Sequence, residues 1–358
     1  MIALETSSAA GKNPVGGIPG AVRNLVHALL RLDPETRYHL CYRFSRWRKG
    51  NLFHPDAPNV SVGVLQDPLN TLLLRRARLL HCMGIFCPRT PAIPKLVTVH
   101  DLNAVRNVQW VTERWHERRS QRILEAVERA DHVVTYSQFT AQEVREEYNL
   151  PGERVHPVHL GVDPETFRPC SDEAAERCRK RHGDFVLSIG LLTPRKNFPA
   201  LIEAVAQLPR TVRLVVVGRP SDGAQAVWEA VRSHRMEERF EHLERVDQAE
   251  LITLLGACRL YAVPSLYEGF GLTVLEAMAC GTPVVCSGAA SLPEAAGDAA
   301  LIVDAGQPEA MAEALRRVLE DSSLREDLRT RGLDRARTWT WERSARHLRR
   351  LYAEVAGV

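Results

Sequence analysis

Short apolar runs alternate with segments of helical periodicity along most of the chain. The runs Phe185–Gly190, Val212–Gly218 and Thr282–Cys286 are mostly apolar, which is typical of strands that are buried on both faces of a sheet. Between the first two runs, Asn197–Leu208 is predicted to form a helix. Apolar strands that alternate with helices predict a parallel, doubly wound α/β sheet.

The first half of the chain repeats this alternation. Met1–Glu5 is predicted to be a strand, the glycine-rich segment Val15–Gly20 a turn, and Ala21–Leu32 a helix. With 358 residues, the chain is long enough for two such domains. Further elements are predicted as helices at Asn107–Arg129 and, capped by Ser137, at Gln138–Tyr148, and as strands at Tyr38–Phe44, Val60–Leu65, Leu79–Met83, Leu96–His100 and His132–Ser137.

The segment Pro264–Ser287 combines a loop, a helix, a tight turn and a strand. Gly269 and Gly271 leave bare backbone at the start of the predicted helix Leu272–Cys280, and Gly281 is positioned to end that helix in a left-handed conformation. The free N–H groups and the positive end of the helix dipole make such a start a site for anions, above all for phosphate. On its own, a glycine pair before a helix is more often a tight turn without a ligand.

Two carboxylates flank this helix start. Glu268 lies in the preceding loop and Glu276 in the second turn of the helix. Eight helical residues span about 12 Å and turn through more than two rotations, so the two side chains are not expected to share a face. Carboxylates accept hydrogen bonds and sugar hydroxyls donate them, so the pair fits a sugar on one side of a diphosphate and a ribose on the other. The alternative is that both glutamates are solvated surface residues.

Two further sites are predicted where strands end. Arg195 and Lys196 lie between a strand and a helix, where adjacent cations suit a pyrophosphate, and we expect both side chains to be exposed to solvent. His100 ends a strand, at the edge where open α/β sheets bind ligands. Ordinary surface charge is the alternative for the two cations, and a structural role is the alternative for the histidine.

The whole string from Glu268 to Val285 resembles the Glu-x7-Glu signature of the retaining glycosyltransferases of family 4, which have the GT-B fold. The resemblance implies that Glu268 contacts the donor sugar and that Glu276 holds the nucleotide ribose. It implies catalytic roles for Glu268, for the diphosphate-clamping Arg195 and Lys196, and for His100, which would reach the donor sugar near the reacting carbon. The implied donor-binding residues, most of them acting through the backbone, are Gly17, Val246, Gly269, Phe270, Gly271, Leu272, Thr273 and Glu276.

Two segments resemble the family less closely. Gly17, Ile18 and Arg23 match the family's Gly-Ile-x-x-x-x-Arg-Asn-Leu segment, but Pro19 and Gly20 stand where many relatives have Gly-Arg. Similarly, Leu160 stands where relatives often have Asn, in the segment that joins the two domains. We therefore do not expect the side-chain contacts that those family residues make.

The resemblance covers nearly the whole chain and implies two Rossmann-like domains that face each other across a cleft. The implied parts are an acceptor-side domain at 1–165, a linker at 166–183, a nucleotide-sugar domain at 184–338 and a last helix, 339–358, that returns to the first domain. The implied reaction transfers a sugar, with retention, from a GDP- or UDP-linked donor to a hydroxyl of a glycan or glycolipid acceptor. A nucleotide-sugar epimerase or hydrolase on the same scaffold, and an inactive relative that binds nucleotide sugars, are the alternatives.

Other classes of protein are disfavoured by motifs that the sequence lacks. There is no G-x-G-x-x-G fingerprint, which disfavours a Rossmann oxidoreductase. There is no Asp-x-Asp pair in a metal-binding context and the eight cysteines form no Cys-x-x-Cys pair, so we expect neither a cofactor nor a metal site. We also expect no nucleic-acid partner. No apolar run of about 18 residues and no signal-peptide pattern occurs, so a reduced, cytoplasmic protein is expected.

Positive charge is concentrated near the start of the chain. Residues 1–122 contain 18 lysines and arginines against eight acidic residues, although the net charge of the chain is only +3. Within them, the segments Phe44–Gly50 and Leu72–Leu80 mix cations with Trp47 and leucines. Such segments suit peripheral contact with an anionic membrane at its cytoplasmic face, where a lipid-linked acceptor would lie. A solvated surface is an alternative of equal weight.

Overall fold

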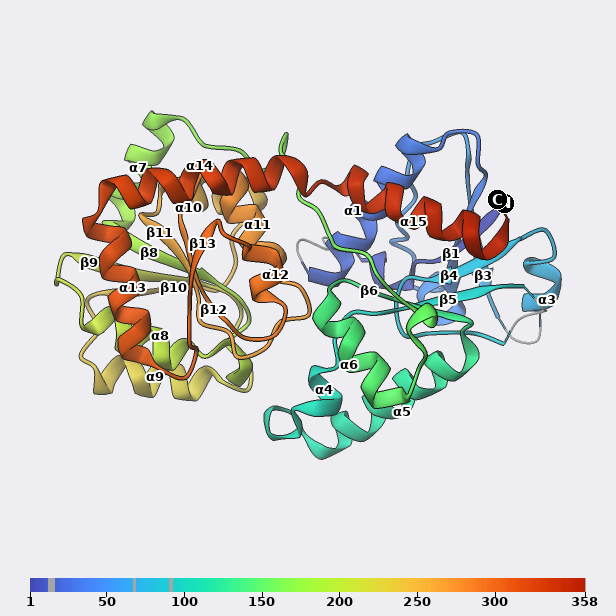
Figure 1. Ribbon diagram of the computed structural model, residues 1–358, viewed down its shortest axis with the longest axis horizontal. Helices are drawn as coiled ribbons and strands as arrows, with labels where there is room; N and C mark the ends of the chain where they lie inside the picture. The colour runs from blue at the N-terminus through green and yellow to red at the C-terminus, as the bar shows by residue number, and fades with distance from the viewer. Residues whose placement is uncertain (12–16, 67–68, 90–92, 358) are drawn as a thin grey trace. The chain divides into compact units, whose positions relative to one another are not determined.

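The computed structural model describes residues 1–11, 17–66, 69–89 and 93–357, which are arranged in two compact units (Figure 1). The first unit contains Met1–Leu160 and Trp341–Val358, and the second contains Gly161–Thr340. Each unit is built around one parallel sheet, and every strand pairing in both sheets is parallel.

The sheet of the first unit has the strand order β3-β2-β1-β4-β5-β6-β7. The chain therefore moves outward in one direction from β1 and then returns to build the other half from β4, as in doubly wound folds. The strands are β1 (Ile2–Glu5), β2 (Tyr38–Arg43), β3 (Val60–Leu65), β4 (Leu79–Cys82), β5 (Lys95–Val99), β6 (His132–Thr135) and β7 (Val155–Pro157).

Helices cover both faces of the first sheet (Figure 1). On one face, α1 (Gly17–Leu32) packs against α15 (Trp341–Ala356), so the last helix belongs to the first unit. On the other face lie α4 (Asn103–Arg106), α5 (Glu113–Arg129) and α6 (Gln138–Tyr148). Buried residues of α5 and α6 share a core with β1, β4 and β5, and the partly buried Val105 of α4 packs against this core. The short helices α2 (Phe44–Trp47) and α3 (Asn70–Leu73) follow β2 and β3.

Two of the helices predicted in the first unit have other bounds in the structure. Helix α1 begins at Gly17 rather than at Ala21, because a proline in the first turn, here Pro19, removes an N–H that has no helical partner; Val15 and Gly16 lie outside the described residues. The predicted helix Asn107–Arg129 is interrupted, since Thr112 is extended with φ −71° and ψ 146° and α5 begins only at Glu113. The β-branched residues just before Glu113 disfavour the helix there.

The sheet of the second unit has the order β10-β9-β8-β11-β12-β13, so its direction of winding reverses between β8 and β11. Helices α8, α9 and α13 lie on one side of the sheet and α7, α10 and α14 on the other (Figure 1). The strands are β8 (Asp184–Ile189), β9 (Val212–Val217), β10 (Phe240–Leu243), β11 (Leu260–Val263), β12 (Val284–Ser287) and β13 (Ala300–Val303). The helices are α7 (Asp172–His182), α8 (Phe198–Ala206), α9 (Ala224–Ser233), α10 (Gln248–Ala257), α11 (Leu272–Ala279), α12 (Leu292–Ala296), α13 (Pro308–Glu320) and α14 (Ser322–Thr338).

The region predicted as a linker, 166–183, contains helix α7. Ser171 caps this helix by accepting a hydrogen bond from the backbone N–H of Ala174 at 3.3 Å, and the helix packs on α10 inside the second unit. The sequence shows the capping residue and the acidic residues of the first turn, Asp172 and Glu173, which favour a helix start. The segment is rich in charged residues, however, so its composition does not indicate that three of its residues are buried.

Two local features, the cap at Ser137 and the left-handed Gly281, match their predictions. Ser137 caps α6 by accepting a hydrogen bond from the N–H of Thr140 at 3.0 Å. Gly281 follows α11 in the left-handed region with φ +74°. All eight cysteines are free thiols, and seven of them are buried. In the described part of the chain, no helix combines the length and apolar character that crossing a membrane requires.

The two basic segments are only partly on the surface. Phe44 and Trp47 of α2 and Leu72 of α3 are exposed, as are the neighbouring arginines and Lys49. Leu74, Leu79 and Leu80, however, are fully buried, so the expectation that they add apolar groups to a basic surface is wrong. Leu79 and Leu80 are consecutive residues of β4, a strand covered on both faces, which buries both side chains.

Candidate functional site

The predicted cations and Glu268 meet where the winding of the second sheet reverses. The segment after β8 contains a short 3-10 turn, Pro194–Lys196, and the segment after the neighbouring β11 contains Glu268. The carboxyl ends of parallel strands lie at one edge of a sheet, and the crevice at such a reversal is where open α/β sheets bind ligands. Arg195 and Glu268 are thus brought together although 73 residues separate them.

Glu268 forms ion pairs with both cations. Its Oε2 lies 2.9 Å from Nη1 of Arg195, and its Oε1 lies 2.6 Å from Nζ of Lys196. The Arg195 Nη1 also donates to the backbone carbonyl of Tyr267 at 2.9 Å. Lys196 fits against the turn because Gly190 has no side chain: a Cβ at that position would lie 2.7 Å from Cε of Lys196.

The three charges are more buried than the sequence predicts. Lys196 and Glu268 are each only 9% exposed, and the Arg195 side chain is 28% exposed, so the expectation that both cations are open to solvent is wrong for Lys196 and only partly right for Arg195. Burial tends to raise the pKa of Glu268, but the charges of Lys196 and Arg195 outweigh that effect and lower it to about 2. Burial lowers the pKa of Lys196, and the charge of Glu268 opposes this shift.

The glycine-rich loop presents the start of helix α11 at the same edge. Gly271 precedes the helix with φ +93°, a conformation that favours glycine, and a Cβ there would lie 2.8 Å from Cδ2 of Leu292. Among the residues that the structure describes, no side chain caps the eight-residue helix Leu272–Ala279, so the first N–H groups, including that of Thr273, remain available to an anion. Phe270 is buried, and its side chain therefore anchors the loop instead of facing solvent.

Glu276 is half-buried in the second turn of α11 and differs from Glu268 in its surroundings. No other residue in the described part of the chain lies in hydrogen-bond contact with its carboxylate, and burial raises its pKa to about 7. The charges of Glu268 and Glu276 both raise the pKa of the buried Tyr261 hydroxyl on β11, whose burial acts in the same direction. One glutamate is therefore held ionised by cations, whereas the other titrates near neutral pH.

Three serines that the sequence analysis does not single out hold Glu268 in place. The hydroxyl of Ser265 donates to Oε1 of Glu268 at 2.7 Å, and that of Ser291 donates to the Glu268 backbone carbonyl at 2.7 Å. Ser287, at the end of β12, donates to the carbonyl of Ser265 at 2.5 Å. All three are buried, and nothing in their sequence spacing predicts these contacts.

Val246 lies at the same edge of the sheet as Arg195 and Lys196 but after a different strand. It follows β10, which β9 separates from β8, and the next residue, Asp247, caps α10 by accepting from the N–H of Glu250 at 2.8 Å. The cap fixes the backbone of this loop, which is the part that the predicted role requires.

His100 and Gly17 belong to the first unit. His100 follows β5 and is 6% exposed, and its ring packs against that of Tyr136, with centroids 5.1 Å apart. Burial, together with the charge of Arg119, lowers its pKa to about 3, so the imidazole is neutral at neutral pH. Gly17 is the exposed first residue of α1, with φ +57°.

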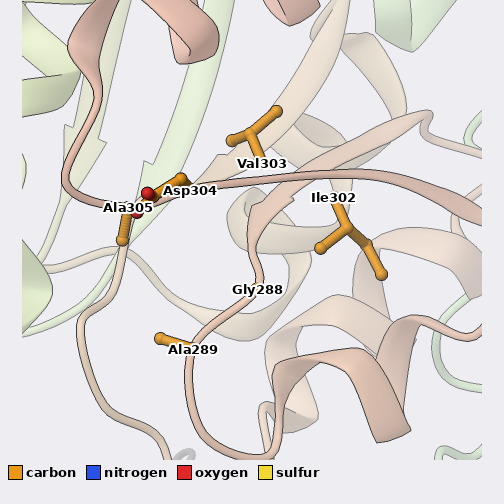
Figure 2. Close-up of a pocket in the computed structure, with 6 residues that line it drawn as sticks. All are labelled: Gly288, Ala289, Ile302, Val303, Asp304 and Ala305. Carbon is orange, nitrogen blue, oxygen red and sulfur yellow. The ribbon is translucent and has the colours of Figure 1, made fainter.

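An open hollow lies beside this site on the second unit. It has a volume of about 460 Å³ and lies at the carboxyl ends of β12 and β13 (Figure 2). Asn197, which directly follows Lys196, donates to the backbone carbonyl of Ala305 in its wall at 3.0 Å. None of its lining residues is among the predicted site residues; they are Gly288, Ala289, Ile302, Val303, Asp304 and Ala305.

Comparison with known proteins gives family matches over both units. Residues 173–335 match the model described as glycosyl transferases group 1, and residues 15–166 match that of glycosyltransferase family 4. The chain is 33% identical over 225 residues to an O-antigen chain mannosyltransferase B of Escherichia coli, covering 61% of this chain and 59% of that protein. It is 34% identical over 282 residues to a D-inositol 3-phosphate glycosyltransferase of Corynebacterium glutamicum, covering 74% of this chain and 67% of that protein.

Two solved structures resemble this chain over almost its full length. Sucrose-phosphate synthase from Thermosynechococcus elongatus superposes with a TM-score of 0.79 at 24% identity, covering 99% of this chain and 98% of that one. The Anabaena protein HepE, in complex with UDP and glucose, gives a TM-score of 0.74 at 18% identity and covers 99% of both chains. These likenesses confirm the GT-B fold with two Rossmann-like domains. On the family matches and the relative from Corynebacterium glutamicum, the chain belongs to the group 1 glycosyltransferases, with a family 4 glycosyltransferase domain in its first half.

Proposed function

We propose that the protein transfers a sugar from a GDP- or UDP-linked donor to a hydroxyl of a glycan or glycolipid acceptor. The observation that carries the proposal is the meeting of Arg195, Lys196 and the uncapped start of α11 at the reversal of the second sheet. Two cations and a set of free N–H groups suit the two phosphates of a nucleoside diphosphate. The names of the relatives, a mannosyltransferase and inositol phosphate glycosyltransferases, agree with this class of reaction.

In this proposal the cations stabilise the leaving diphosphate. Charge develops on the diphosphate as the bond to the sugar breaks, and preorganised charges at that place lower the barrier most effectively. Glu268 forms ion pairs with Arg195 and Lys196, so the donor phosphates must share or take over these partners. The carboxylate would then be free to contact hydroxyls of the donor sugar, as the family resemblance implies.

Glu276 and His100 have complementary parts in the proposal. Glu268 precedes the start of α11 in the sequence and Glu276 follows it. Glu276 would accept hydrogen bonds from the ribose hydroxyls. His100, as a neutral imidazole at the end of β5, would hydrogen-bond the donor sugar. Gly17 and Val246 would contribute backbone contacts to the donor.

We further propose that transfer retains the anomeric configuration and needs no divalent metal. Both follow from the resemblance of Glu268–Val285 to the family 4 signature, and the two site cations supply the charge that a metal would otherwise bring. The product configuration is measured by NMR, and activity is expected to survive EDTA. Inversion, or a loss in EDTA that Mn²⁺ restores, would overturn the corresponding part.

The central experiment combines binding and turnover with UDP- and GDP-sugars. The protein should be stabilised by UDP or GDP, by about 2.7 kcal/mol at a hundredfold excess over Kd. Arg195→Ala should lower kcat/KM on the order of 10²-fold, whereas Arg232→Ala, an exposed arginine at the end of α9, should leave it unchanged. No stabilisation by any nucleoside diphosphate would refute the proposal. Nucleotide release that does not depend on an acceptor would favour the epimerase or hydrolase alternative.

The acceptor is proposed to be anionic. The surplus of positive charge in residues 1–122 belongs to the first unit, which the family resemblance makes the acceptor side. An inositol phosphate, as in the names of several relatives, and a lipid-linked phosphate at the cytoplasmic face of a membrane share this chemistry. A membrane-bound acceptor would make the protein a peripheral, cytoplasmic enzyme, and the exposed basic segment around α2 would then contact the lipid.

A further inference from the structure

The end of helix α14 touches the loop that carries the candidate site. We define the donor loop as Glu268–Gly271. The ring of Trp339, the residue that follows α14, stacks on the ring of Phe270, with centroids 6.0 Å apart and an interplanar angle of 26°. Phe270 is 4% exposed, so the stack closes over a side chain at the middle of the donor loop.

A second series of contacts links α14 to the donor loop by way of α12. Arg335 donates from Nε to the carbonyl of Ala295 at 2.6 Å and from Nη2 to the carbonyl of Glu294, two carbonyls in the last turn of α12. At the other end of α12, Ser291 donates to the Glu268 carbonyl at 2.7 Å. Leu292 lies against Gly271, leaving no room there for a side chain.

Arg335 and Trp339 also contact each other, and α14 packs on α11 itself. Cζ of Arg335 lies 4.5 Å from the centroid of the Trp339 ring, a cation–π contact. Earlier in α14, Gly332 allows close packing on α11, since a Cβ there would lie 3.2 Å from Cγ of Met278. Thus α14 holds the body of α11, while its last residues hold the loop that precedes α11.

We propose that Trp339 and Arg335 are positioning residues that fix the donor loop and so aim the first N–H groups of α11 at the donor diphosphate. The inference rests on the proposed function for the identity of the ligand. A loop with two glycines has little stiffness of its own, and its N–H groups stabilise an anion fully only when they are held in place before binding. Neither residue touches the reacting atoms in this scheme.

The test compares Trp339→Ala with Trp339→Phe, which keeps an aromatic ring for the stack. Trp339→Ala should weaken UDP or GDP binding at least tenfold by calorimetry and lower kcat/KM at least as much, and Trp339→Phe should restore both to within about threefold of wild type. Arg337→Ala is the matched control, because Arg337 is an exposed residue of the same helix turn that pairs with Asp334 at 3.0 Å. The hydrogen bond from the N–H of Val162 to the Trp339 carbonyl, at 2.8 Å, uses the backbone and is kept in both variants.

Hydrogen exchange separates failure of this inference from failure of the proposed function. The amide of Val274, which donates to the carbonyl of Gly271 at 2.9 Å, should lose protection in Trp339→Ala and keep it in Trp339→Phe and Arg337→Ala, whether or not a nucleotide is added. Unchanged protection in Trp339→Ala, or unchanged nucleotide affinity in that variant, would overturn the positioning role. A wild-type protein that binds neither UDP nor GDP, with the loss of protection still observed in Trp339→Ala, would refute the proposed function and leave the role in holding the loop supported.

Discussion

Glu268 is the counter-ion of Arg195 and Lys196, and we expect its replacement to separate binding from catalysis. In Glu268→Gln the two cations lose their internal anion, so a diphosphate no longer competes with it. We expect UDP or GDP to bind more tightly, on the order of tenfold, while sugar transfer is lost. Calorimetry and turnover measure the two effects.

The same variant should be less stable without a ligand. Removing one partner of a buried ion pair costs about 3–5 kcal/mol, because a charge is left buried without compensation. Nucleotide should restore much of this loss, so the ligand-induced rise in melting temperature should be larger in Glu268→Gln than in the wild-type protein. Weaker nucleotide binding by the variant would show that Glu268 assists the diphosphate instead of competing with it.

The ionisation of Glu276 should make nucleotide binding depend on pH near neutrality. Burial raises its pKa to about 7, and hydroxyl donors from a ribose favour the ionised form. Affinity for UDP or GDP should therefore rise between pH 6 and 8, with release of a proton on binding. Glu276→Gln is the comparison, since it keeps the pH dependence that the phosphates contribute, and identical pH profiles would contradict the assignment.

Glu276 also affects the stability of the free protein in a definite direction. Its pKa is higher in the folded than in the unfolded state, so the folded state loses stability as the pH rises from about 4.5 to 7 and the carboxyl ionises. At pH 8, ligand-free Glu276→Gln should be more stable than wild type, by on the order of 1–3 kcal/mol. At pH 4 the two proteins should unfold at nearly the same temperature.

At the scale of single elements, the short helix α2 is the part of the basic region best suited to a membrane. Phe44 and Trp47 are 44% and 38% exposed beside Arg46, Arg48 and Lys49. Each cation near an anionic leaflet contributes about 1 kcal/mol. Co-sedimentation with anionic vesicles should therefore be seen at low salt, fade as salt rises and weaken in Arg46→Glu/Arg48→Glu.

The segment around α3 offers a second arm of that experiment. Arg75→Glu/Arg76→Glu should weaken vesicle binding as well, since both arginines and Leu72 are exposed. Arg232→Glu on α9 is the control and should leave binding unchanged. Absence of binding to anionic vesicles at low salt would remove the membrane from the proposal and favour a soluble anionic acceptor such as an inositol phosphate.

At the scale of the whole molecule, the last helix completes the first unit although it follows the second in sequence. Tyr352 of α15 hydrogen-bonds through its hydroxyl to Nδ1 of His81 at 2.6 Å, and Nε2 of His81 contacts the hydroxyl of Thr98 at 2.8 Å. Burial lowers the pKa of His81 to about 3, so the ring is neutral and can donate at one nitrogen and accept at the other. A side chain of α15 is thus needed to satisfy a buried residue of β4.

Tyr352→Phe should consequently destabilise the first unit by about 1–3 kcal/mol, because a buried nitrogen of His81 loses its partner. In a thermal or denaturant scan with UDP or GDP present, we expect the nucleotide to stabilise the unfolding transition of the second unit. The midpoint of that transition should be the same in Tyr352→Phe as in the wild-type protein. Tyr148→Phe is the control, since the buried Tyr148 hydroxyl has no hydrogen-bond partner among the described residues. Equal effects of the two substitutions would contradict the role of the His81 contact.

The sequence by itself determined the parts of this protein that depend on neighbouring residues. Apolar runs and turns predicted the parallel sheets, and the string from Glu268 to Val285 predicted the helix start, its glycine loop and the left-handed end at Gly281. Capping by Ser137 was also predictable, because a cap acts over three residues. The extent of α1 and the interruption before α5 were not, since boundaries depend on small differences in local propensity.

Only the tertiary structure decided how the site residues act on one another. Whether Lys196 is exposed or buried, and whether Glu268 is its partner, depends on two loops that are 72 residues apart in the chain. The pKa values of Glu268 and Glu276, about 2 and about 7, differ because one glutamate is placed between two cations and the other is buried without a charged partner. The roles of Trp339 and Arg335 could not be predicted from the sequence either, because both residues belong to what reads as an ordinary polar helix end. Their contacts with Phe270 and α12 form only in the folded chain.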